Sequence, residues 1–136
     1  MSDEARLAVG IILLTVPTIE YGGYFLLSLY MKPADGFSNL QLSMFRAGHA
    51  HAGVIVILSL VLQLFVDSAD LSSSLAWFVR IGAPLSAILI SAGFFASVRS
   101  SEQTRPDGLI RIVYAGALLL MASLVVLGVG LIGTVL

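Results

Sequence analysis

The chain lacks cysteine and has few charged residues. None of its 136 residues is Cys, which excludes disulfides, thiolate metal sites, iron–sulfur clusters and cysteine nucleophiles. Only 11% of the residues are Asp, Glu, Lys or Arg, whereas an ordinary soluble domain has about 25%. The basic stripe that nucleic-acid binding requires is also missing from the sequence, so we expect no nucleic-acid partner.

Long apolar runs make up most of the chain. Hydrophobic residues make up 58% of the chain, and its mean hydropathy is +1.01. Four runs, at residues 7–31, 47–66, 75–98 and 109–136, each contain at least 20 residues, and about 20 helical residues cross the hydrocarbon core of a bilayer. Runs of this length without alternating polar residues are not those of a β-barrel. We therefore predict an all-α integral membrane protein, with residues 1–136 forming one four-helix up-down bundle in the lipid bilayer.

Basic residues are concentrated on one predicted side of the membrane. Because such residues are retained in cytoplasmic loops, we expect a plasma (inner) membrane protein with both termini outside. The loops after the first and third runs, with the adjoining run ends, hold Lys32, Arg46, Arg99, Arg105 and Arg111, whereas the opposite side holds Arg6 and Arg80.

Small residues three or four positions apart indicate where helices contact protein rather than lipid. They are the pairs Ala83/Ala87, Ala92/Ala96 and Gly130/Gly133.

Ionisable side chains lie inside two of the predicted spans, and such groups are candidate functional residues. Glu20 lies near the middle of the first span, and the chain's two histidines, His49 and His51, open the second. An unpaired carboxylate in a span costs about 2.5 kcal/mol or more, so Glu20 must stay protonated or pair with a cation, for which His49 and Arg46 are candidates. Tyr24 lies one turn beyond Glu20 on the same face and can donate a hydrogen bond to it.

The two histidines point in different directions on a regular helix. Residues two apart are separated by about 160° around the helix axis. His49 shares its face with Gly53 and Gln63, which predicts that this face is the bundle interior and that His49 is the inward ligand. His51 would then meet a neighbouring subunit, an interfacial water or the edge of a cofactor. The two histidines can bind one metal ion together only if the helix unwinds at Gly48 and Gly53. The alternative is that each imidazole only forms a hydrogen bond with neighbouring backbone.

The string Arg46-Ala-Gly-His-Ala-His-Ala-Gly-Val54 resembles the His-x-His segment that opens a helix in certain small membrane proteins. Those proteins are distantly similar to the catalytic subunits of heme-copper oxidases and nitric oxide reductases. The resemblance covers nine residues and implies heme ligation by His49 or, alternatively, His51. The large enzymes take ligands from several helices, whereas this chain has two histidines on one. A homo-oligomer could place one His49 from each of two subunits on a shared heme.

Four functional hypotheses follow. The first is a membrane-embedded protein that binds heme or a transition metal, with a redox or gas-linked role as an oxidoreductase. The others are a small proton-coupled transporter or channel that uses Glu20 and His49, an accessory subunit of a larger membrane complex, and a cofactor-free membrane enzyme. Imidazole suits zinc, copper, iron and nickel alike, so the metal and any enzymatic activity stay open here. In the first hypothesis the metal ligands are His49, His51 and Glu20, and Arg46, Gly53 and Tyr24 adjoin the cofactor.

Overall fold

The structure, a computed structural model, describes residues 1–31 and 36–136. The described residues form four long helices and no strand, and all four helices are long and apolar enough to cross a membrane. The predicted all-α four-helix architecture is thus confirmed. The helices are α1 (Asp3–Met31), α2 (Asn39–Val66), α3 (Ser73–Ala96) and α4 (Arg111–Gly133), and the short 3-10 helix η1 (Gly108–Ile110) leads into α4.

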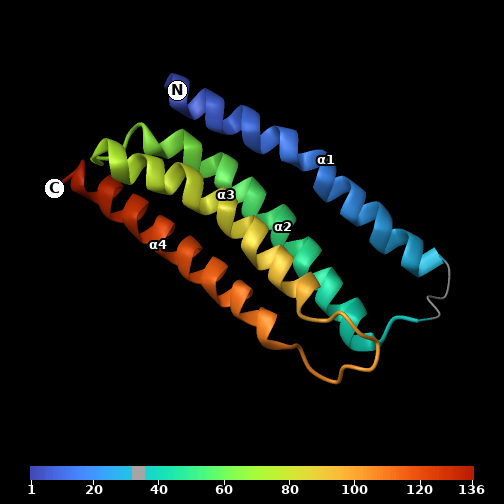
Figure 1. Cartoon of the computed structure of the whole chain (residues 1–136). Coiled ribbons are helices and arrows are strands. Elements are labelled where there is room, and N and C mark those ends of the chain that lie inside the picture. The colour runs from blue at the N-terminus through green and yellow to red at the C-terminus, as the bar shows by residue number, and fades with distance from the viewer. Residues whose placement is uncertain (32–35) are drawn as a thin grey trace.

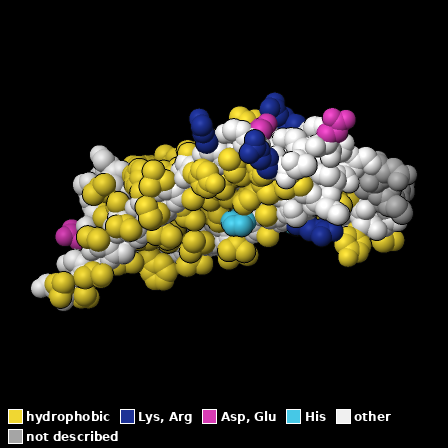
Figure 2. All heavy atoms as spheres, turned by 90° about the horizontal axis from the view of Figure 1, so that it is seen from below, with side chains coloured by type: hydrophobic (Ala, Val, Ile, Leu, Met, Phe, Trp, Pro, Cys, Tyr) yellow, Lys and Arg dark blue, Asp and Glu magenta, His cyan; other side chains and the backbone are white. Residues whose placement is uncertain are grey.

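Consecutive helices run in opposite directions, with α2 and α3 in the middle, α1 on one side and α4 on the other (Figure 1). Both chain termini lie at one end of the bundle, which we call the terminal end. The opposite end, where α1 is followed by α2 and α3 by η1, is called the loop end. Hydrophobic side chains form a broad continuous area on the face shown in Figure 2, and basic side chains lie along its border.

The second helix begins earlier than the sequence predicts. It starts at Asn39 rather than at residue 47, because Ser38 and Gln41 form a capping box in which each side chain accepts a hydrogen bond from the other's backbone N–H. Gln41 is also buried and donates through Nε2 to the Val98 carbonyl at 3.0 Å, which ties the start of α2 to the end of α3. His49 therefore lies almost three turns inside its helix, at the level of the last turns of α3.

Helix contacts are closest at glycines. A Cβ added to Gly48 of α2 would lie 2.9 Å from the Phe95 ring of α3. A Cβ on Gly93 of α3 would come within 2.7 Å of the Val113 backbone nitrogen of α4. A Cβ on Gly116 of α4 would lie 3.0 Å from a backbone nitrogen of α3. Such close approach supplies the van der Waals contact that holds membrane helices together.

The predicted small-residue pairs locate these interfaces in part. Ala83, Ala87 and Gly130 are buried, as expected. Ala92 and Gly133 are exposed, and a Cβ on Gly133 would meet nothing within 4 Å among the described residues. Small size therefore permits close packing at a position but does not by itself create it.

We expect Gly93→Ala to lower the free energy of unfolding by about 1–3 kcal/mol, because the added methyl collides with the backbone of α4 and forces the two helices apart. The matched control is Gly128→Ala on α4, where the new Cβ meets nothing within 4 Å. Ala is the better helix former by up to about 1 kcal/mol, so the control should be neutral or stabilising. Circular dichroism, recorded while a denaturing detergent unfolds the protein in micelles, measures the free energy of unfolding of both variants. Equal losses in the two variants would contradict the interface.

Candidate functional site

His49 lies between α1 and α2. Its half-buried imidazole covers Gly22 and Gly23 of α1, because a Cβ on Gly22 would lie 3.3 Å from Nδ1 and a Cβ on Gly23 would lie 3.3 Å from Nε2. The ring thus occupies the space that the two glycines leave empty. We call Gly22, Gly23 and His49 the α1–α2 seam. A flat macrocycle cannot reach His49 from this side unless α1 moves away.

His51 is exposed and carries a fixed hydrogen bond. Its Nδ1 lies 2.7 Å from the carbonyl oxygen of Ala47, one turn earlier in α2. A carbonyl only accepts, so Nδ1–H is the donor and the neutral ring keeps its lone pair on Nε2. The ring centroid lies 5.1 Å from that of Phe94 on α3. A histidine side chain is visible among hydrophobic side chains on the face in Figure 2.

This hydrogen bond distinguishes the two imidazoles. Histidines that ligate metals usually donate their second ring N–H to a carbonyl or carboxylate, which fixes the tautomer and aims the ligating nitrogen. His51 has this arrangement, and its ring is exposed. The contacts therefore favour His51 over His49 as the imidazole prepared to bind a ligand, whereas the sequence pattern favoured His49.

The other predicted site residues are spread around the bundle. Glu20 is exposed on α1, and its carboxylate forms no ion pair within the described part of the chain. Tyr24 is also exposed. The guanidinium of Arg46 lies 5.5 Å from the centre of the Tyr30 ring in a cation–π contact, so Arg46 faces α1. Gly53 is half-buried, with nothing within 4 Å of where its Cβ would lie.

These residues do not form one metal site. Within residues 1–31 and 36–136, no three His, Asp or Glu side chains are close enough to hold an ion together. His49, His51 and Glu20 are therefore not a three-ligand set in this arrangement.

Both faces of α2 are packed. Val56 and Gln63, on the His49 face, are buried as predicted. Gly48, Ile55 and Leu62, on the His51 face, are buried too. Burial is therefore not specific to the His49 face, because α2 contacts both α1 and α3.

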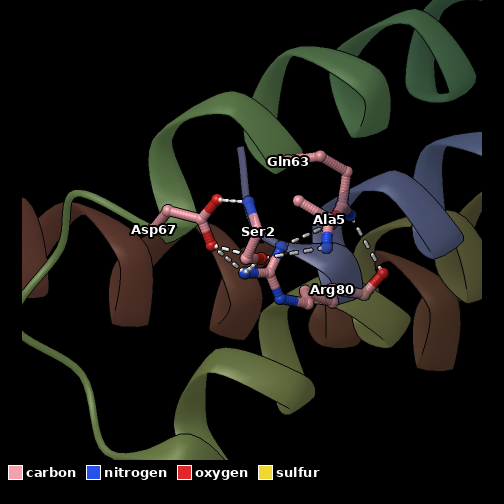
Figure 3. A network of polar contacts seen from close by, with 5 residues as sticks. All are labelled: Ser2, Ala5, Gln63, Asp67 and Arg80. Atoms are coloured by element: carbon pink, nitrogen blue, oxygen red, sulfur yellow. Dashed lines mark hydrogen bonds and ion pairs between the residues drawn. The ribbon is translucent and has the colours of Figure 1, made fainter.

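A buried polar cluster at the terminal end was missed by sequence reasoning. From the sequence, Arg80 is one of the two basic residues on the side of the membrane that has few of them. In the structure this residue of α3 is only 5% exposed. Its guanidinium forms an ion pair with Asp67 and donates to Gln63 Oε1 at 3.1 Å and to Ser2 Oγ at 3.4 Å (Figure 3). Gln63 returns a bond from Nε2 to the Arg80 carbonyl at 3.2 Å. We call these four residues the Arg80 cluster; it joins the start of α1 to α2 and α3.

Asp67 is the acceptor on which the Arg80 cluster converges. Ser2 donates to its carboxylate from the backbone nitrogen at 2.7 Å and from the hydroxyl at 2.8 Å. These bonds, with the Arg80 guanidinium, lower the pKa of Asp67 to about 2 from its ordinary value of 3.8. A signal was present in the sequence, since Gln63 and Asp67 are one turn apart at the end of an apolar helix. Their partner, however, is on another helix.

We expect Asp67→Asn to lower the free energy of unfolding at pH 7 by about 1–3 kcal/mol, because a charge-assisted bond to Arg80 is lost. A folded-state pKa below the unfolded one stabilises the fold above about pH 4, and this contribution disappears as pH falls toward 2. Wild type and variant should therefore converge in acid. The control is Asp70→Asn, since Asp70 is exposed and bonds Gly130 through its backbone. Thermal unfolding in detergent from pH 7 to pH 2 measures this; a pH-independent difference would refute the role of the carboxylate.

Comparisons of the chain with models of known protein families, with curated proteins and with solved structures find no match. The resemblance of residues 46–54 to heme-binding membrane proteins therefore stays an expectation. The functional argument rests on the contacts of the residues themselves.

Proposed function

We propose that this protein binds heme within the membrane and that His51 would hold the iron. The observation that carries the proposal is the 2.7 Å contact between His51 Nδ1 and the Ala47 carbonyl, which leaves Nε2 as the ligating atom. The ring is exposed in the apolar surface of a helix that is long and apolar enough to cross a membrane. An apolar macrocycle can reach it there directly from the bilayer.

The donor set fits heme better than an isolated metal ion. A protein zinc site takes three or four ligands from the chain, and no such group exists among the described residues. Heme iron already has its equatorial ligands from the porphyrin and needs one or two axial ligands from protein. One exposed imidazole per chain meets that smaller requirement, and the neighbouring Phe94 ring provides an apolar contact for the macrocycle.

A second imidazole for the same heme would come from His51 of a second copy of the chain. A two-fold contact presents the same surface twice, so two His51 side chains can face one heme across it. A heme held by two imidazoles supplies one-electron transfer when bound. Within the chain, His51 holds and orients the ligating nitrogen, while Phe94 and the surrounding apolar side chains exclude water. Arg46 faces Tyr30 of α1, so we do not assign it to the heme propionates.

Proton-coupled transport by Glu20 and His49 has less support. The idea requires the two groups to exchange a proton, yet the described residues show no hydrogen bond from Glu20 to His49. His49 instead contacts the glycine pair of α1. The α1–α2 seam accounts for His49 as a packing residue.

We also propose that the loop end is cytoplasmic and both termini are outside. The loop end holds most of the basic residues, whereas Arg80 at the terminal end is paired with Asp67. Because the chain has no native cysteine, a single introduced cysteine can report this. Val135→Cys should react with a membrane-impermeant maleimide on intact cells, and Ser101→Cys only after permeabilisation. The reverse pattern would refute the orientation.

The heme proposal predicts that purified protein reconstituted with hemin shows a Soret band that His51→Ala abolishes. His49→Ala is the matched control and should keep the band, because the His49 ring is covered by α1. Iron analysis should give one heme per two chains, and His51→Ala should leave zinc and copper contents unchanged. Loss of the Soret band in His49→Ala but not in His51→Ala would mean that His49, and not His51, is the iron ligand. Equal heme content in wild type and both variants would refute ligation by either histidine.

A further inference from the structure

A groove with a volume of about 340 Å³ lies between α1 and α3, toward the terminal end of the bundle. Its floor is buried and includes Ile12, Val56 and the stem of Arg80. Its rim is exposed and includes Leu7 of α1 and Trp77 of α3. We call this the lateral groove, because it opens sideways from helices that are long and apolar enough to cross a membrane.

The lateral groove exists because α1 packs mainly against α2 and is linked to α3 at the terminal end. In the second half of α1, the α1–α2 seam holds this helix against α2 through His49. At the terminal end the Arg80 cluster fixes it through Ser2. Between these two points the short side chain of Ala8 and the ring of Pro84 line the groove and leave the space between α1 and α3 unfilled.

The polar side-chain atoms that Thr15 and Arg80 bring to the lateral groove are already engaged. The Thr15 hydroxyl donates to the Ile12 carbonyl of its own helix at 2.7 Å. The Arg80 guanidinium bonds Asp67, Gln63 and Ser2. What the groove offers a ligand is therefore apolar contact, and recognition of a polar head group is not built into it.

We propose that the lateral groove binds one acyl chain of a membrane phospholipid. The groove opens where hydrocarbon chains surround the protein, and its lining matches them in polarity. A second copy of the chain suits the groove less well, because a stable protein interface buries about 800 Å² on each partner. The groove residues cover only about three turns of α1 and of α3. An acyl chain is the narrow, flexible and apolar occupant that the shape admits.

Trp77 provides the test, since it is the only tryptophan of the chain and lines the lateral groove. Detergent-solubilised protein is titrated with phosphatidylcholine that carries brominated acyl chains, which quench tryptophan on contact. Most of the Trp77 emission should be lost, and the loss should saturate near one lipid per chain. Phosphatidylglycerol with the same chains should behave alike, because Arg80 is engaged. Quenching that grows without saturation indicates ordinary boundary lipid and overturns the proposal, as does a strong head-group preference.

The matched variants are Ala8→Phe, which fills the lateral groove, and Ala117→Phe on the exposed surface of α4. Ala8→Phe should abolish the saturable quenching, and Ala117→Phe should keep it. If Ala8→Phe loses helicity by circular dichroism, Ala8→Leu replaces it. Saturable quenching that survives either groove-filling variant overturns the assignment to the groove. Emission that is insensitive to lipid but changes with protein concentration shows a second copy on the groove and overturns it equally.

Discussion

Helices in a bilayer gain little from burying apolar side chains against each other, because lipid tails are as apolar as leucine. This bundle is held instead by close backbone approach and a few polar contacts. Gly48, Gly93 and Gly116 bring α2, α3 and α4 to distances at which a methyl group would collide. No buried side-chain nitrogen or oxygen in the described residues lacks a hydrogen-bond partner. Gly48 in particular brings α2 against Phe94 and Phe95 of α3, and Phe94 is the aromatic neighbour of His51.

The two ends of the bundle use different polar chemistry. At the terminal end the Arg80 cluster is compact, and its charge is balanced by Asp67. At the loop end the polar contacts are separate: the buried Gln41 bonds the Val98 carbonyl, and the exposed Arg99 pairs with Asp107 at 2.7 Å. In the heme proposal, the ligand approaches His51 beside Phe94, near the end of α3.

Much of the fold could be predicted from the sequence, because four apolar runs of membrane-crossing length leave few alternatives. The start of α2 could not, since its first two turns mix polar and apolar residues and their helical state depends on a capping box and on Val98, far along the chain. The two histidines could be identified as candidates, but their roles could not. The space around His49 is set by two glycines of α1, and the tautomer of His51 by a carbonyl. The Arg80 cluster was hidden because Ser2 and Arg80 are 78 residues apart.

The sparse burial of α1 bears on the order in which the bundle assembles. Along this helix, which the structure describes in full, only Ala5 and Ile12 are buried, whereas α2 and α3 each bury many residues. The hairpins α2–α3 and α3–α4 join neighbours in sequence and hold the tightest glycine contacts, so they can form as a unit soon after insertion. We infer that α1 docks last, as the Arg80 cluster closes and His49 meets its glycines. A stalled or destabilised chain would then be a three-helix intermediate with a lipid-solvated first helix, and quality-control proteases of the membrane would find their most accessible segment there.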